Sequence, residues 1–188
     1  MEIMESSTWN EEELLLDELE KVSSEYRQNS CDEKRQSLLH FLQNNDCRPK
    51  ISKCSNNDNL SKAFICAGQL NHHDILQTLL DFGMNIDIKD NFGNTALIYA
   101  SQYGHEESVR LLLYRNVNVN VNIQNKSGYS ALMYASGNRY KNVVQLLLDH
   151  NADIDLKCEN NKTASDWTND EEIKEMIQNH VTTSYVLK

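Results

Sequence analysis

The sequence contains three similar segments, spaced 33 and 35 residues apart. Residues 90–116, DNFGNTALIYASQYGHEESVRLLLYRN, align without a gap with residues 125–151, NKSGYSALMYASGNRYKNVVQLLLDHN, at a shift of 35. Residues 57–83, NDNLSKAFICAGQLNHHDILQTLLDFG, align with the middle segment at a shift of 33. Repeats of this length are typical of solenoids, in which each unit packs only against its neighbours. We therefore expect a row of stacked units.

Each unit carries apolar residues with helical spacing in two short segments. An alanine in the first segment leaves room for two helices to approach closely, and a leucine pair in the second follows an apolar residue by three positions. The equivalent positions are Ala67, Ala100 and Ala135, then Leu76, Val109 and Val144, then Leu79-Leu80, Leu112-Leu113 and Leu147-Leu148. We predict two helices per unit, whose apolar faces become buried only when units stack.

Glycine and asparagine alternate at two further positions of the repeat. The first position, just after the second helix, holds Gly83, Asn116 and Asn151, and the second holds Gly93, Gly128 and Asn161. These are the two residue types that best tolerate a left-handed backbone. We therefore predict left-handed residues at both places.

The stretch VNVNVN, residues 117–122, has the apolar/polar alternation of a β-strand. Gly83 to Gly93 spans ten residues, however, whereas Asn116 to Gly128 spans twelve. The stretch therefore contains two extra residues in a connector, and no new sheet is required. An insertion of two keeps later side chains on their original faces of an extended chain. Two interpretations stay open: a longer connector that reaches a partner, or a neutral duplication in a tolerant loop.

At these residues the chain resembles the ankyrin repeat family. The family's T-P-L-H-x-A signature is similar to Thr95-Ala-Leu-Ile-Tyr-Ala100 and Ser130-Ala-Leu-Met-Tyr-Ala135, and its G-A-D-x-N ending to GMNID and NADID. Pro and His of the signature are absent, and Arg139-Tyr140 replaces the Gly-His found at Gly104-His105. The resemblance covers roughly residues 57 to 167. It implies an all-α solenoid of helix-turn-helix units with β-hairpin-like connectors.

We expect an N-terminal segment followed by the repeat array. The boundaries are 1–56 for the N-terminal segment and 57–188 for the array, which comprises units 57–89, 90–124, 125–157 and a partial capping repeat 158–181. Thr168 with Glu171 has the spacing of a capping box and predicts the start of the last helix.

Residues 1–56 are predicted to form two helices followed by a loop. Thr8 with Glu11 and Ser30 with Glu33 mark the two helix starts, the first helix ends near residue 27, and Pro49 lies in the loop. The segment is either a degenerate capping repeat or a separate arm that folds against, or dimerises through, its leucine stripe.

Charge and composition limit the partners. The net charge is −10, from 28 acidic and 18 basic residues, and no basic cluster suited to phosphates is present, so direct nucleic acid binding is not expected. A partner protein with a basic surface fits this charge. No stretch is long and apolar enough to span a membrane. The acidic N-terminus lacks the pattern of a secretory signal, so we expect a cytoplasmic or nuclear location.

No catalytic pattern is found, and we expect a non-enzymatic protein without cofactor, metal or small-molecule substrate. Cys66 precedes His72 and His73 by six and seven residues, a pairing that leaves a Cys-dependent hydrolase as one alternative. Cys66 falls inside a predicted helix, and His72 takes the position of the family's Gly-His, so structural roles are favoured for both.

The resemblance implies an adaptor or inhibitor that binds a partner protein with the turn tips and the concave face of the first helices. A permanent structural subunit of a larger assembly is the alternative. Phe92, Tyr103 and Tyr129 stand out, because exposed aromatic side chains favour burial at an interface. Carried over position by position, the surface comprises Asp58, Asn59, Ser61, Gln69, Leu70, Asn91, Phe92, Asn94, Gln102, Tyr103, Lys126, Ser127, Tyr129, Gly137 and Asn138.

Overall fold

The computed structural model describes residues 21–27, 32–44, 58–115 and 119–186, and these residues form helices joined by turns. After a helical segment at residues 21–27, the elements are α2 (Asp32–Asn44), α4 (Asp58–Gln69), α5 (His73–Asp81), α6 (Ala96–Tyr103), α7 (Glu106–Arg115), α8 (Ala131–Gly137), α9 (Lys141–Asp149), the 3-10 helix η1 (Ser165–Trp167) and α10 (Glu171–Val186). Strand-like pairing in the described ranges amounts to an isolated antiparallel bridge between Gln124 and Ser130. The predicted all-α architecture is confirmed.

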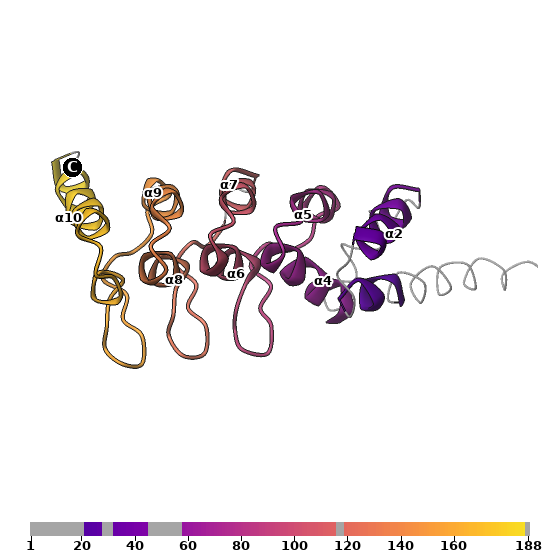
Figure 1. Cartoon of the computed structure of the whole chain (residues 1–188), viewed down its shortest axis with the longest axis horizontal. Helices are drawn as coiled ribbons and strands as arrows, with labels where there is room; N and C mark the ends of the chain where they lie inside the picture. Colours follow the sequence, from indigo (N-terminus) through magenta and orange to yellow (C-terminus); the bar gives the residue numbers. More distant parts are fainter. Residues whose placement is uncertain (1–20, 28–31, 45–57, 116–118, 187–188) are drawn as a thin grey trace, which may run out of the picture.

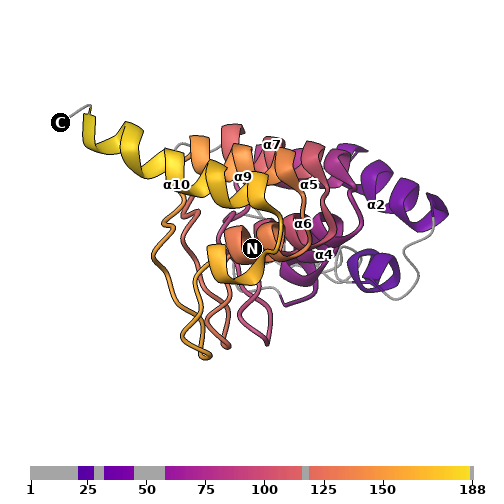
Figure 2. The same ribbon diagram turned by 60° about the vertical axis from the view of Figure 1, so that its left-hand side comes forward.

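The helices form two parallel rows (Figure 1). In the first row α4 contacts α6, α6 contacts α8 and α8 contacts η1, while in the second row α2, α5, α7, α9 and α10 contact one another in that order. The extended turns between units, residues 84–95, 119–130 and 152–163, project side by side from the first row (Figure 2) and are called fingers below. The chain is a solenoid, as the repeat predicts.

Equivalent side chains of successive units form one continuous core. Ala67, Ala100 and Ala135 have no exposed surface, and neither do the first leucines of the three pairs, Leu79, Leu112 and Leu147. The second leucines are buried at 113 and 148, whereas Leu80 is half-buried against the same core. The shared interior predicted from the leucine and alanine pattern is therefore present.

The first residue of each signature motif caps a helix. The hydroxyl oxygen of Thr95 accepts a hydrogen bond from the Ile98 N–H at 3.2 Å, and that of Ser130 accepts one from the Met133 N–H at 3.3 Å. Each hydroxyl satisfies a backbone donor that has no partner inside the helix. The threonine or serine of the motif thus fixes where α6 and α8 begin.

The predicted left-handed positions are confirmed where the structure describes them. The backbone φ is 85° at Gly83, 81° at Gly93 and 79° at Gly128, and the two equivalent asparagines, at 151 and 161, both have φ of 59°. Asn116 lies outside the described residues.

Glycine is required in the fingers for a second reason, because adjacent fingers touch through their backbones. The Lys126 N–H donates to the Phe92 carbonyl at 2.9 Å, and the Glu159 N–H donates to the Ser127 carbonyl at 3.2 Å. A Cβ atom on Gly93 would lie 2.9 Å from the Lys126 nitrogen. The close packing of fingers leaves no room for a side chain there.

The structure locates the two extra residues of the second connector more narrowly than the sequence does. Asn85, Asn120 and Asp153 each accept a hydrogen bond from the backbone N–H two residues further on, at 3.0, 3.1 and 2.9 Å, so these three positions are equivalent. The extra length therefore precedes Asn120. Residues 119–122 form a turn and no strand, which confirms that no sheet begins there.

The predicted capping box of the last helix is wrong. α10 begins at Glu171, and the Asp170 carboxylate accepts hydrogen bonds from the N–H groups of Glu172 and Ile173, at 3.1 and 3.4 Å. Thr168 accepts instead from the Asp170 N–H at 3.1 Å. Asp170 stands directly before the first helical residue, so its carboxylate reaches the free N–H groups that Thr168, two residues earlier, cannot reach.

The described N-terminal residues pack against the first unit. Tyr26, Leu38 and Leu42 have no exposed surface and belong to the common core, and α2 contacts α5 as each later second-row helix contacts the next. Residues 21–27 are helical, which agrees with the predicted end of the first helix near residue 27. The predicted starts at Thr8 and Ser30 and the loop around Pro49 lie outside the described residues. We propose that residues 21–27 and α2 belong to a degenerate capping repeat, the first of the two alternatives.

Candidate protein-binding surface

The finger tips are shaped by a polar side chain that takes up the backbone donors of the turn. The Asp90 carboxylate accepts hydrogen bonds from the N–H groups of Phe92 and Asn94, both at 2.8 Å. In the next finger, the Asn125 side-chain oxygen accepts from Ser127 at 3.1 Å and Tyr129 at 2.9 Å. These side chains satisfy the backbone N–H groups within each turn and leave the side chains at the tip exposed.

A tyrosine on α6 braces the first finger. The Tyr99 hydroxyl donates to the second carboxylate oxygen of Asp90 at 2.8 Å. Burial, together with this carboxylate, raises the pKa of Tyr99 although a hydrogen bond from Asn94 opposes the shift. Tyr99 therefore remains protonated and keeps its donor role at neutral pH.

In the third finger, the thiol of Cys158 takes the position that Asp90 holds in the first finger and Asn125 in the second. Cys158 is 5% exposed. Burial alone raises the pKa of its thiol, but N–H groups of Lys162 and Asn160 and the Trp167 side chain outweigh burial and lower it. The sulfur thus occupies the position of the Asp or Asn oxygen, and the residues two and four further on, Asn160 and Lys162, are the equivalents of those that donate in the other fingers.

Phe92 is the most exposed large apolar side chain on the finger tips, with 69% of its surface accessible. Its neighbour Asn91 is exposed, and so are Lys126 and Ser127 on the next tip. The sequence placed all four on the partner surface, and the structure leaves all four accessible to a partner.

A second aromatic group surrounds the end of α6. Tyr103 is 44% exposed and its ring stacks on His105 at a centroid distance of 5.9 Å. The ring of Tyr140, 36% exposed, covers Gly104 so closely that a Cβ there would lie 2.6 Å from it. Sequence reasoning missed Tyr140 as a surface residue. The signal was the replacement of the family's Gly-His by Arg139-Tyr140.

The polar residues at the ends of the first helices serve partly as links between units. The His105 ring nitrogen Nε2 hydrogen bonds with the Gln69 carbonyl oxygen, and the Asn138 amide donates to the Gln102 carbonyl, both at 2.9 Å. Asn138 is exposed, whereas Asn59, Ser61, Gln69, Leu70 and Gln102 are half-buried, and Gly137 is exposed at the end of α8.

Two of the predicted contact residues hold the repeats together instead. Asn94 is 8% exposed, because its amide donates to the Tyr99 hydroxyl at 3.2 Å and its oxygen accepts from Asn125 at 2.8 Å. It bridges two fingers and is removed from the surface. Tyr129 is half-buried against Tyr134 and Trp167, with ring centroids 5.2 and 5.1 Å apart. The side chain of Asp58 lies outside the described residues.

The cysteine and histidines considered for catalysis have other surroundings. Burial raises the pKa of Cys66, which disfavours the thiolate that a nucleophile needs. The Nδ1 atom of His72 lies 2.7 Å from the Tyr26 hydroxyl. Within the described ranges no group of three or more His, Cys, Asp or Glu residues is placed to hold a metal ion, and no helix is long and apolar enough to cross a bilayer.

Comparisons with known proteins agree with the geometry. A family model described as ankyrin repeats in three copies matches residues 16–123, and one described as ankyrin repeats in many copies matches residues 112–166. Together they cover the described N-terminal helices, the three full units and the beginning of the last one.

Similar curated proteins come from plants. The chain is 35% identical over 71 residues to the probable E3 ubiquitin-protein ligase XBOS32 of Oryza sativa subsp. japonica, and 35% identical over 74 residues to the E3 ubiquitin-protein ligase XBAT33 of Arabidopsis thaliana. These matches cover 38% and 39% of this chain but 14% of each relative. The repeat period, the stacked helix pairs and the family models lead to one conclusion: the chain belongs to the ankyrin repeat family.

Proposed function

We propose that this protein is a non-enzymatic adaptor or inhibitor that binds a partner protein through its finger tips and the first-row helices. The observation that carries the proposal is the 69% exposure of Phe92 at the tip of a finger whose turn is held by hydrogen bonds to Asp90. Such a side chain loses unfavourable contact with water when a partner covers it. Because the backbone of the turn is already hydrogen-bonded, less conformational entropy is lost on binding.

The aromatic side chains at the end of α6 also support a binding surface on the finger tips and first-row helices. Tyr103 and Tyr140 are partly exposed on either side of Gly104, and aromatic residues are enriched among those that dominate binding energy. Lys126, bonded to the Phe92 carbonyl, and Asn138, bonded to the Gln102 carbonyl, supply exposed polar groups beside Phe92 and Tyr103, as expected of an interface with an apolar centre and a polar rim.

The overall charge of −10 supports a partner with a basic surface, since opposite charges speed association at moderate salt. It does not favour nucleic acid, where phosphates would be repelled. The cytoplasm or nucleus remains the expected location.

The ligase activity named for the plant relatives is not carried over, because the similarity covers about one-seventh of their length. A Cys66-dependent hydrolase is disfavoured by the raised pKa of the thiol. A permanent structural subunit would use the same surface and differs in stoichiometry and lifetime of the complex.

Affinity purification from the source cells tests the proposal. Wild-type protein is compared with a Phe92→Ala/Tyr103→Ala variant, whose two side chains are exposed and whose removal leaves the core intact. We expect one partner to be lost with the variant while its circular dichroism and melting temperature stay unchanged. Several chains recovered in equal amounts with both proteins would support the structural subunit, and equal recovery of every partner would refute the proposed surface.

A further inference from the structure

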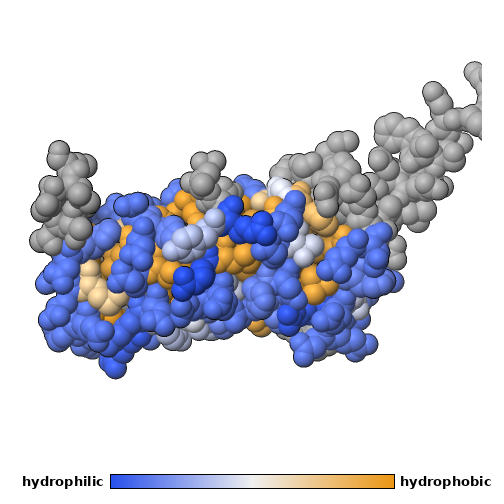
Figure 3. Space-filling model, turned by 90° about the horizontal axis from the view of Figure 1, so that it is seen from above, coloured by the Kyte–Doolittle hydropathy of each residue, from blue (hydrophilic) through white to orange (hydrophobic). Residues whose placement is uncertain are grey.

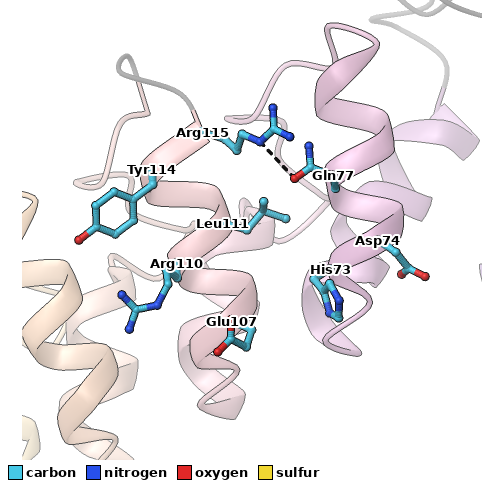
Figure 4. Close-up of a pocket in the computed structure, with 8 residues that line it drawn as sticks. All are labelled: His73, Asp74, Gln77, Glu107, Arg110, Leu111, Tyr114 and Arg115. Atoms are coloured by element: carbon cyan, nitrogen blue, oxygen red, sulfur yellow. Dashed lines mark hydrogen bonds between the residues drawn. The ribbon is translucent and has the colours of Figure 1, made fainter.

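A groove lies on the second-row face, away from the fingers (Figures 3 and 4). It lies between α5 and α7 and has a volume of about 870 Å³. Seen from above, apolar surface lies exposed between bands of polar side chains on this face (Figure 3). The side chain of Leu111 points from α7 toward α5, and Tyr114 follows on the side facing α9 (Figure 4).

At Tyr114 the second unit departs from both neighbours, and at Leu111 it departs from the first unit alone, because α9 has Leu146 at the equivalent position. Where α7 has Leu111, α5 has the polar Thr78, and where α7 has Tyr114, the neighbouring helices have Asp81 and Asp149. Tyr114 is 60% exposed, although its edge contacts the His150 ring at a centroid distance of 4.6 Å. The stack itself therefore does not require an aromatic residue here, since the other units form without one.

Among the described acids that line the groove, Glu107 has no protein partner. Arg110 pairs with Glu106 at 2.9 Å, Arg115 with Asp81 at 3.0 Å, and Asp74 with Arg35 at 2.7 Å. Glu107, one helical turn before Leu111, is exposed and forms no ion pair or hydrogen bond with any residue that the structure describes. A cationic group on a ligand would complement it.

We propose that this groove binds an amphipathic α-helix of a partner protein, with apolar side chains against Leu111 and Tyr114 and a lysine or arginine against Glu107. From Glu107 to Arg115 the groove runs about 12 Å along α7, the length of roughly two helical turns. Side chains at positions i, i+4 and i+7 of a ligand helix lie on one face at this spacing. The surface is separate from the fingers, so the inference stands independently of the proposed function.

The test uses a phage-displayed library of amphipathic helical peptides, selected on the full-length protein. We expect selected peptides to carry apolar residues at i and i+3 or i+4 with a lysine or arginine one turn away. Synthetic copies are then measured by isothermal titration calorimetry against wild type, Leu111→Thr/Tyr114→Asp and Glu107→Gln. The double variant installs residues that the first unit already holds, so folding is expected to be retained.

Affinity should fall at least about tenfold in the double variant and about threefold in Glu107→Gln, equivalent to about 1.4 and 0.7 kcal/mol. Binding to Phe92→Ala should be unchanged, which separates this site from the finger surface. Selected peptides that bind the double variant equally well, peptides with an acidic residue in place of the basic one, or a library that yields no binder would each overturn the proposal. A variant that fails to melt cooperatively is replaced by Leu111→Thr alone.

Discussion

The guanidinium of Arg35 in α2 binds both carboxylate oxygens of Asp74 in α5, with Nη2 2.7 Å from Oδ2 and Nε 3.1 Å from Oδ1. The side chains are 24% and 28% exposed, so the pair is shielded from solvent more than an ordinary surface ion pair. This bidentate contact joins α2 to the first unit.

Replacing Arg35 by Ala should lower the free energy of unfolding by about 1 to 2 kcal/mol, because a charged hydrogen-bond pair is lost and Asp74 stays partly buried. A double-mutant cycle with Asp74→Ala, followed by urea denaturation, measures the coupling. We expect about 1 kcal/mol of coupling between the two residues. Additive effects would mean that α2 is held by its apolar face alone.

The partial burial of His72 predicts a pH dependence of stability. Burial, and secondarily the nearby Arg35, lowers the pKa of His72 below its ordinary value of 6.5. The folded state then binds fewer protons than the unfolded state between the lowered pKa and 6.5, so stability falls as the pH decreases through that window. Urea unfolding at pH 7.5 and 5.5 should show the loss, and His72→Gln should make it smaller. An unchanged pH dependence in that variant would assign the effect to other groups.

Gly83, just before the first finger, and Gly93, within it, should differ in their tolerance of alanine. Gly83 has positive φ but open space around its Cβ position, so Gly83→Ala should destabilise by about 1 kcal/mol. In Gly93→Ala the same strain is joined by a clash with the Lys126 nitrogen, and the loss should exceed 2 kcal/mol. Thermal melting of the two variants makes the comparison, and equal losses would show that the fingers separate easily.

Cys158 should be replaceable by the residues of the other fingers. Cys158→Asn installs the acceptor found at Asn125 and should keep or raise stability, whereas Cys158→Ala leaves the N–H groups of Asn160 and Lys162 without an acceptor. That loss should amount to about 1 to 2 kcal/mol. Equal melting temperatures for the Ala and Asn variants would show that the sulfur accepts no important hydrogen bond.

Much of the fold was predictable because the repeat encodes it three times. The alignment of Ala67, Ala100 and Ala135 places three helices in one layer, and the alternation of Gly with Asn marks the turns. The described N-terminal helices were harder, because their contacts with the first unit rest on single residues, such as Tyr26, that match no repeat position.

The candidate surface was less predictable, because exposure depends on neighbouring units. Asn94 and Asn91 lie in the same turn and look alike in sequence, yet Asn94 is buried by its bonds to Tyr99 and Asn125 while Asn91 stays exposed. Tyr129 likewise lies near Trp167, 38 residues later in the chain, and packs on it. A side chain that points toward the next repeat cannot be distinguished from a free one without the stack.

The most direct test measures the affinity of the purified partner for wild type and for Phe92→Ala/Tyr103→Ala by calorimetry. The Leu111→Thr/Tyr114→Asp variant, changed on the opposite face, serves as the control. We expect the dissociation constant to be at least about tenfold larger for the finger variant and unchanged for the control, with melting temperatures preserved. Equal affinities of wild type and the finger variant would contradict it.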